Sequence, residues 1–284
     1  MDTMIREHAW FLVFWGLIVA LGTLEALFPQ FEAPADRKRR WPTNFGIGLL
    51  NGLLISSLPA FVVLSAQWAE SNGFGLLNWL SAPWWIVVPV TLLLRSLATY
   101  VFHVISHKVP LLWRLHRVHH CDVHLDVSSA LRAHPIELIV LLMLAAPVVT
   151  IFGLSAVTLA AYESVEVIAN MLTHSNIRLP KAVERYAGWL VITPSAHRLH
   201  HSARQIETDS NYGNVFSFWD RLFGTYRSEP VQGEAFRFGL DEVSRDDAAS
   251  FEAQMRLPFF PGGTGAVLPA TMQKPRSEAN ADAI

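Results

Sequence analysis

The chain has 284 residues, of which 51% are hydrophobic and only 16% are charged, and its formal net charge is −2. Soluble domains carry about 25% charged residues, so this composition indicates a chain that lies largely in lipid. It excludes a disordered protein and a basic nucleic-acid binder, and the single cysteine, Cys121, excludes an internal disulfide, a CxxC redox site and a cysteine-ligated iron–sulfur cluster.

Five apolar stretches follow one another along the chain, and the sequence predicts a helix for each. They lie at residues 9–28, 45–66, 83–102, 136–152 and 154–172. A membrane-spanning helix needs about 20 mostly apolar residues, which the first three stretches provide. Only Gly153 separates the last two, so we expect a helical hairpin there. The expected fold class is all-α, a multi-pass membrane helical bundle of about three spanning helices plus the hairpin, with a cytosolic histidine-rich helical cap.

The basic run Arg37-Lys38-Arg39-Arg40 predicts the orientation of this bundle. Lys and Arg concentrate in cytoplasmic loops, and following the stretches from this run brings His103 and His174 to the same cytoplasmic face. We expect transmembrane helices at 1–102, a di-metal catalytic region at 103–230 that includes the membrane hairpin 136–172, and a C-terminal tail at 231–284, loose after about Pro258. The short basic loop and compact ends favour a bacterial plasma membrane.

Histidines are concentrated in one part of the chain, since eleven of the twelve lie between His103 and His201. Eight of them form clusters with helical spacing: His103 and His107; His116, His119 and His120; His197, His200 and His201. Positions three and four apart share a helix face, so each cluster directs its imidazoles toward one point. A lone histidine would be an interfacial residue, but eight packed together without a metal would leave many buried ring nitrogens unsatisfied. The clusters therefore predict a metal centre.

The residues around these clusters form motifs of their own. They are LWRLHRVHH at 112–120, RAHPIE at 132–137, HSN at 174–176, TPSAHRLHH at 193–201, DSNYG at 209–213 and WDRLFGTY at 219–226. Together they resemble the signature of the membrane fatty acid hydroxylase / sterol desaturase superfamily, over about residues 84–226. The resemblance implies a multi-pass membrane fold with a cytosolic centre of two metal ions, normally iron, that uses O2 as co-substrate on lipids. Two departures are Ser96, where the family often has Asp, and Val104, where it often has Arg.

A polar stripe runs along the last apolar stretch, where Glu163, Glu166, Asn170 and His174 share one helix face. The resemblance makes His174 a ninth metal ligand, with Asn170 one turn deeper and able to reach the metal through water. For the two acids, a functional role and simple pairing with Arg95 across the bundle stay equally open.

Beyond the metal ligands the sequence identifies no catalytic residue and no cofactor-binding motif. The candidates for the outer shell of the metal centre are His124, His134, Glu166, Asp209 and Asp220. The two aspartates could accept the outer N–H of ligand histidines, or they could only close loops.

Nitrogen ligands suit zinc, copper, nickel or iron, so ligand type alone does not choose the metal. A site at the membrane face is placed to meet a lipid, and oxidising a lipid C–H bond needs a redox metal and O2. We therefore expect an O2-dependent di-iron lipid hydroxylase or desaturase. The alternatives are a zinc-dependent membrane hydrolase and a non-catalytic membrane protein with a structural metal; zinc could also replace iron in overexpressed samples.

The sequence contains no electron-transfer module, so the expected enzyme needs an external donor. A ferredoxin, a rubredoxin or a cytochrome b5-like protein with its reductase would serve. Arg114, Arg117, Arg132 and Arg198 are expected to offer a basic surface to such an acidic partner, or equally to anchor the chain to anionic lipid.

Overall fold

The computed structural model describes residues 2–32, 36–57, 61–231 and 236–259. Within these ranges the chain is all-helical and has no β-strand, which confirms the expected class. The longer helices are α1 (Asp2–Leu27), α2 (Arg37–Ser57), α3 (Phe61–Ser71), α5 (Trp84–Lys108), α6 (Pro110–His120), α7 (Pro135–Phe152) and α8 (Ala156–His174). The shorter ones are α4 (Leu76–Trp79), η1 (Val127–Leu131), α9 (Lys181–Ala187), α10 (Pro194–His200), α11 (Gln205–Thr208), α12 (Phe218–Phe223), α13 (Arg245–Ala248), α14 (Phe251–Arg256) and η2 (Leu257–Phe259).

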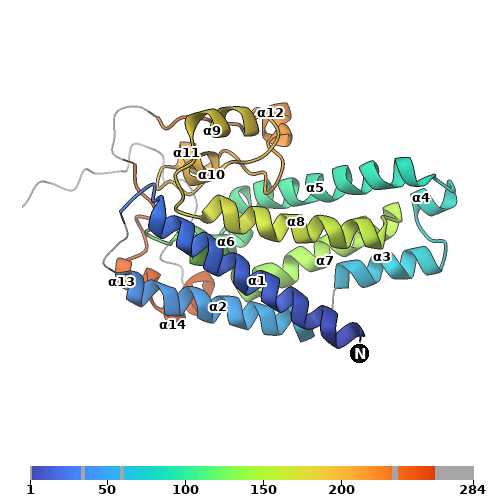
Figure 1. The fold of residues 1–284 in the computed structure, drawn as a ribbon, viewed down its shortest axis with the longest axis horizontal. Helices are drawn as coiled ribbons and strands as arrows, with labels where there is room; N and C mark the ends of the chain where they lie inside the picture. The colour runs from blue at the N-terminus through green and yellow to red at the C-terminus, as the bar shows by residue number, and fades with distance from the viewer. Residues whose placement is uncertain (1, 33–35, 58–60, 232–235, 260–284) are drawn as a thin grey trace, which may run out of the picture.

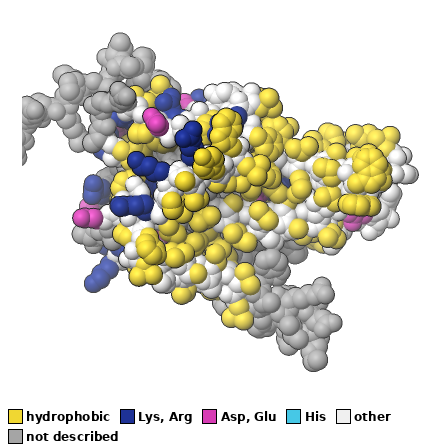
Figure 2. Space-filling model, turned by 45° about the horizontal axis from the view of Figure 1, so that its top comes forward, with side chains coloured by type: hydrophobic (Ala, Val, Ile, Leu, Met, Phe, Trp, Pro, Cys, Tyr) yellow, Lys and Arg dark blue, Asp and Glu magenta, His cyan; other side chains and the backbone are white. Residues whose placement is uncertain are grey.

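The long helices lie roughly along the longest axis of the molecule, and most short helices gather toward one end (Figure 1). Helices α9 to α12 lie beside the end of α8, whereas α13 and α14 lie beside α2. Figure 2 shows Lys and Arg side chains toward the end with the short helices, and a mostly hydrophobic face beyond it. A charged end and an apolar body are typical of a membrane protein with one solvated cap.

Among the described residues, two helices, α5 and α7, are long and apolar enough to cross a bilayer by length and composition, and α1 has a shorter apolar part at Leu12–Leu27. Their outward-facing side chains are large and hydrophobic, as Trp84 and Met143 illustrate. These helices support a membrane location. The total number of spans stays a prediction.

The apolar stretch at 45–66 does not form the single helix that was expected. Helix α2 ends at Ser57 and α3 begins at Phe61. The sequence has Pro59 between them, and proline lacks the amide proton that a helix interior needs. Helix α2 also begins at Arg37, so the basic run forms its first turn rather than a loop.

Arg40 in that first turn is fully buried and joins α2 to the loop after α6. Its guanidinium contacts both oxygens of Asp122 at 2.6 and 2.8 Å and one oxygen of Asp126 at 3.1 Å. Burial alone would raise the pKa of Asp122, but the neighbouring Arg40 and Arg132 guanidinium groups hold it well below its ordinary value. Arg40 is therefore a structural cross-link rather than a lipid-facing charge.

The expected hairpin is present, with α7 and α8 joined by a short turn at Gly153. Gly153 has a φ of 65°, a conformation that side chains disfavour. The loop before α4 packs against this turn, and a Cβ added at Gly75 would lie only 2.4 Å from the backbone nitrogen of Gly153. Both positions therefore need glycine. From the turn the two helices diverge, and α3 packs against both of them. Their divergence leaves room for a cavity at the other end of the hairpin.

Residues 236–259, within the expected tail, pack on α2 and α6. Gln254 is buried and accepts a hydrogen bond from the Cys121 thiol at 2.8 Å, and the Pro258 carbonyl accepts one from Arg114 at 2.6 Å. The rest of the stretch expected to be loose lies outside the described residues, and the division into three regions stays a prediction.

Candidate metal centre

Four helices present the clustered histidines to one region at the charged end of the bundle. His103 and His107 occupy the last turns of α5, and His174 ends α8. The second cluster lies on α6, which has a proline in its first turn, and the third lies on and just after α10, which Thr193 caps. The expected helical spacing is therefore present in all three clusters.

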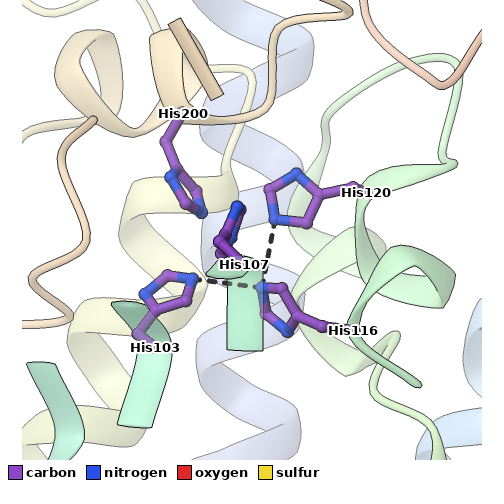
Figure 3. A group of neighbouring side chains, drawn as sticks. All are labelled: His103, His107, His116, His120 and His200. Carbon is purple, nitrogen blue, oxygen red and sulfur yellow. Dashed lines mark hydrogen bonds between the residues drawn. The ribbon is translucent and has the colours of Figure 1, made fainter. Parts of the chain in front are cut away.

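The larger group of imidazoles, which we call the five-histidine group, consists of His103, His107, His116, His120 and His200 (Figure 3). Each ring offers one nitrogen, and these atoms all lie within 4.8 Å of one another. The Nε2 atom of His116 lies 3.1 Å from Nε2 of His103 and 3.1 Å from Nε2 of His120. All five residues are buried.

The smaller group, the four-histidine group, consists of His119, His174, His197 and His201. Nε2 of His174 lies 3.1 Å from Nε2 of His119 and 3.1 Å from Nε2 of His197. Two pairs of sequence neighbours are divided between the groups, because His120 and His200 belong to the larger one. The groups are adjacent: the rings of His120 and His201 stack with centroids 4.4 Å apart.

Backbone carbonyls and one carboxylate accept hydrogen bonds from the outer nitrogens of five rings. The Nδ1 atoms of His103, His174, His200 and His119 lie 2.6, 2.7, 2.8 and 3.3 Å from the carbonyl oxygens of Tyr212, Asn170, Ser210 and Arg132, respectively. Nδ1 of His116 lies 2.6 Å from Oε1 of Glu137. An N–H group at Nδ1 leaves Nε2 unprotonated and directed into the group, which is the arrangement of metal-ligating imidazoles.

The inner nitrogens of the two groups are arranged to bind a cation. Since His103 and His116 each donate from Nδ1, the two Nε2 atoms that face each other at 3.1 Å both carry lone pairs. His119 and His174 repeat this arrangement. The Nε2 atoms of His200 and His201 and both ring nitrogens of His107 are buried without a hydrogen-bond partner. Lone pairs in contact and orphaned nitrogens are costly unless a metal ion shares them.

A proton on an imidazole nitrogen would compete with a metal ion, and the surroundings of these imidazoles disfavour their protonation. Burial, reinforced by neighbouring imidazoles, lowers the pKa of His119, His120, His197 and His201 well below the ordinary value. The same causes lower the pKa of His200 to about 3. These rings are neutral at pH 7, which is the form that binds metals.

A cavity of about 370 Å³ begins at the imidazoles and extends between the diverging hairpin helices. Rings of both groups line one end of this inner cavity, among them His103, His116, His119 and His197. Side chains of α3, α5, α7 and α8 form the walls. Its volume falls within the range of small-molecule sites, so a ligand in it would lie against both groups.

The structure places the two candidate aspartates beside the centre but not on an imidazole. Asp220 accepts the backbone N–H groups of Tyr212 and Gly213 at 2.8 and 2.9 Å, which holds the Tyr212 carbonyl near His103. Asp209 accepts the Tyr212 hydroxyl at 3.0 Å and lies 4.0 Å from Nδ1 of His107. Both aspartates therefore act on the loop that contacts the centre.

The other outer-shell candidates have separate roles. His134 caps α7 by accepting the Ile136 N–H at 3.2 Å, and the ring of His124 lies against Phe238. Neither belongs to the two groups. The amide of Asn170 lines the inner cavity and donates to the Ala130 carbonyl at 3.1 Å, and Glu166 pairs with Arg95.

Glu137 is the residue that the sequence analysis missed. It lies in the first turn of α7, far from His116 in sequence, and lines the inner cavity. The signal that could have revealed it is an acid at the start of an otherwise apolar stretch, within the motif RAHPIE.

The expected basic surface is wrong for three of its four arginines. Arg117, Arg132 and Arg198 are buried, because their guanidinium groups join backbone segments around the histidines. Arg132, for example, donates to the Val118 carbonyl at 3.0 Å, and Arg198 donates to the Ser175 carbonyl at 3.3 Å. Because these three guanidinium groups are buried, they are not accessible to a partner protein.

Comparison with known proteins agrees with this geometry. The profile of the family described as fatty acid hydroxylase matches residues 88–225, which include all nine histidines. Over these residues the chain is similar to this family. No solved structure matches it significantly.

Several curated proteins of the family are similar to the chain. An ornithine lipid hydroxylase, OlsE, of Rhizobium tropici is 27% identical over 86% of this chain and 76% of its own length. An alkylglycerol monooxygenase of Xenopus tropicalis is 29% identical over 66% of this chain and 41% of its own length. Human cholesterol 25-hydroxylase is 29% identical over 49% of this chain and 51% of its own length. The chain thus spans only about half or less of the last two proteins.

Proposed function

We propose that this chain is an O2-dependent lipid hydroxylase or desaturase with a cofactor of two iron ions. The observation that carries the proposal is the pair of buried imidazole groups, whose free nitrogens face each other at the end of the inner cavity. The similar proteins are named as a hydroxylase of ornithine lipid, a monooxygenase of alkylglycerol and a hydroxylase of cholesterol, so oxidation of a lipid is what they have in common.

The five-histidine group would hold one ion and the four-histidine group the other, with Asn170 placed to reach the second through water. A bound pair of redox-active ions supplies the activation of O2 that an inert C–H bond requires. The residues of the chain orient and protect this chemistry. The carbonyls of Tyr212 and Asn170 fix the ring orientations of His103 and His174.

The walls of the inner cavity exclude water from the reacting end of a lipid. Leu138, Leu141 and Leu142 of α7 and Phe102 of α5 form the apolar part of the lining. A dry site strengthens electrostatic interactions and prevents loss of a reactive oxidant to solvent. The same ligands serve hydroxylation and desaturation, so we propose both outcomes for this site.

We also propose that the metal centre lies on the cytoplasmic side of a bacterial plasma membrane. Lys38 and Arg39 in the first turn of α2 and Lys181 and Arg185 of α9 are exposed. Helix α9 and the first turn of α2 lie at the end of the bundle that holds the short helices (Figure 1), as the positive-inside rule expects for a cytoplasmic face. Electrons would come from an external donor, a ferredoxin, a rubredoxin or a cytochrome b5-like protein with its reductase.

Metal analysis joined to lipid analysis tests the proposal. We expect the full chain, purified from iron-supplemented cells and reloaded with ferrous iron, to hold about two irons. Lipid extracts of expressing cells should contain a species heavier by one oxygen or lighter by two hydrogens than those of cells without the gene. A His174→Ala variant should lose about half of the iron and the new lipid species, whereas His124→Gln, outside both groups, should keep both.

Other results would favour the alternatives. Hydrolysed lipids and activity restored by zinc alone would indicate a hydrolase. Chelation that unfolds the protein, with unchanged lipids, would indicate a structural metal.

A further inference from the structure

A groove of about 1020 Å³ lies between α9, α10 and the segments that follow α1, α8 and α12. Its charged residues are four basic ones, Arg178, Lys181, Arg185 and Arg221, and two acidic ones, Glu184 and Glu229. This basic groove therefore has an excess of two positive charges, although the whole chain has a net charge of −2. Figure 2, which brings α9 forward, shows Lys and Arg side chains gathered at this end of the molecule.

Most of the positive charge in the basic groove is accessible and unpaired. Arg178, Lys181 and Arg185 are exposed, and within the described ranges none of them forms an ion pair with a carboxylate. Glu184, in contrast, accepts the Ser195 hydroxyl at 2.8 Å and lies 3.9 Å from the guanidinium of buried Arg198. The acid already has partners behind the groove, so the exposed cations are available to an anionic ligand.

One wall of the groove consists of an arginine between two aromatic rings. The Arg221 guanidinium lies 3.7 Å from the ring centroid of Tyr226 and 4.3 Å from that of Trp189, and it donates to the Gly188 carbonyl at 2.8 Å. These contacts hold the charge in a fixed position. Trp189 is nevertheless 65% exposed. Exposed tryptophan beside arginine is typical of the central part of a protein–protein interface.

Two short segments of the chain connect the basic groove to the metal centre. Ser195 and Ala196 line the groove, and the next residue, His197, belongs to the four-histidine group. Arg178 lines the groove from the other segment and follows His174, a second member of that group, by four residues. The groove therefore lies directly outside two rings of the four-histidine group.

The basic groove and the inner cavity have no lining residue in common. A lipid in the inner cavity would therefore leave the groove free. The proposed chemistry needs such a second approach, because electrons must also reach the centre, and eight of its nine histidines are buried. A donor protein is too large for a cavity of about 370 Å³, so it must deliver electrons from the outer surface.

Two kinds of anionic partner fit the charge of the groove, an acidic redox protein and a layer of anionic lipid head groups. The position behind α10 favours the protein, because membrane anchoring does not require proximity to the histidines. The concave shape also favours it, since a layer of head groups is flat. Electron-transfer complexes bury little surface and are steered by charge, so a groove of this size is sufficient.

We propose that the basic groove is the docking surface for an acidic electron-transfer protein, which delivers electrons beside the four-histidine group. Each docking of a one-electron donor oxidises the donor by one electron and reduces one ferric ion to the ferrous state. Two dockings thus supply the two electrons that are used with each O2. This inference rests on the proposed function and assigns its electron donor a different surface from the one expected from the sequence.

Reduction of the ferric centre tests docking separately from lipid oxidation. The iron-loaded full chain, in neutral detergent and without O2, is mixed with a reduced acidic [2Fe–2S] ferredoxin, and the rate of reduction is followed. The dissociation constant of the complex with oxidised ferredoxin is measured in parallel. We expect Lys181→Glu and Arg185→Glu each to weaken binding and to slow reduction about tenfold at low salt. Salt should slow the parent more than either variant, because it screens the attraction.

Two controls isolate the docking step. Lys38→Glu makes the same change of charge at an exposed position in the first turn of α2, outside the groove, and should bind ferredoxin as the parent does. Photoreduced deazariboflavin is a small uncharged reductant that needs no docking surface. It should reduce the parent and all variants at the same rate.

Three results would overturn the inference. Equal ferredoxin binding and reduction in the parent and both groove variants would show that the groove is not the docking surface. An equal loss in Lys38→Glu would show that only the overall charge matters. Weaker binding of a water-soluble phosphatidylglycerol by the groove variants, with unchanged ferredoxin binding, would show that the groove binds anionic lipid.

Failure of the proposed function gives a different result. A metal-loaded centre that accepts electrons from neither ferredoxin nor deazariboflavin is not a redox centre, which would overturn the proposed function itself. A centre that deazariboflavin reduces, but that ferredoxin reduces equally in the parent and the groove variants, would overturn only the docking surface.

Discussion

The two imidazole groups differ in their number of rings and in the acceptors behind those rings. In the five-histidine group a carboxylate, that of Glu137, accepts the outer N–H of His116 at 2.6 Å. In the four-histidine group the acceptors are neutral carbonyls, those of Asn170 and Arg132. A carboxylate raises the basicity of an imidazole more than a carbonyl does. We therefore expect the larger group to hold its ion more tightly and the smaller one to leave more coordination positions open.

Removal of a ring from the smaller group should have the largest effect. His174→Ala leaves three rings there, so we expect the iron content to fall from about two to about one per chain and turnover to fall at least about 100-fold. His107→Ala is the matched variant, because it leaves four rings in the larger group and should keep most of the iron. Metal analysis of both purified variants checks the comparison, and unchanged iron in His174→Ala would contradict it.

Removal of the carboxylate should weaken only the larger group. Glu137→Gln keeps a possible acceptor but loses the charge, so we expect metal affinity at one of the two sites to fall about 10- to 100-fold. A chelator competition titration would resolve the two sites. Glu252→Gln is the control, since it removes a carboxylate on the exposed face of α14, outside the metal centre. Equal losses in both variants would show that the carboxylate has no special effect.

Acid should destabilise the metal-free protein through both groups. The pKa of His200 is lowered to about 3, and those of His120 and His201 are also lowered. Because unfolded histidines titrate near pH 6.5, the unfolded chain binds more protons than the folded one below that pH. We expect the midpoint temperature of thermal unfolding to be constant above about pH 7 and to fall progressively as the pH is lowered from about 6.5 to 3. A midpoint temperature that rose on acidification would contradict the conclusion that these imidazoles are buried and neutral in the folded protein.

The smallest effect is expected at Asp220, which acts on the larger group only through the Tyr212 loop. Asp220→Asn should retain one of its two backbone hydrogen bonds and lower metal affinity at that group about threefold, with a loss of about 1–2 kcal/mol in the free energy of unfolding. Chelator competition and chemical unfolding measure the two quantities. Asp241→Asn, at an exposed ion pair with Arg237, should leave metal affinity unchanged, and an equal loss there would show that the effect is general.

Much of the centre could be predicted because helical periodicity is local. The spacing of His116, His119 and His120 places them on one side of a single helix in any fold. The division of the rings into groups of five and four could not be predicted, because neighbours such as His119 and His120 belong to different groups. That division depends on how α5, α6, α8 and α10 meet.

The failed predictions have a common physical origin. A guanidinium in the sequence looks the same whether it faces solvent or lies buried among carbonyls. Arg132 and Arg198 were therefore expected on a surface, and Arg40 in a cytoplasmic loop, whereas all three form buried cross-links. Glu137 escaped notice for the converse reason, since its partner His116 is distant in sequence and only packing brings them together.

The order of amino acids alone determined an all-helical chain with apolar helices and eight clustered histidines suited to a metal, because hydrophobicity, helical spacing and side-chain chemistry act over a few residues. His174 was added by the family resemblance. Tertiary structure decided which nitrogens face each other and which acceptors lie behind them. It also decided where α7 and α8 separate to leave a cavity beside Arg95, Glu163 and Glu166. These features depend on contacts between segments far apart in the chain, and such contacts follow from how whole helix faces pack.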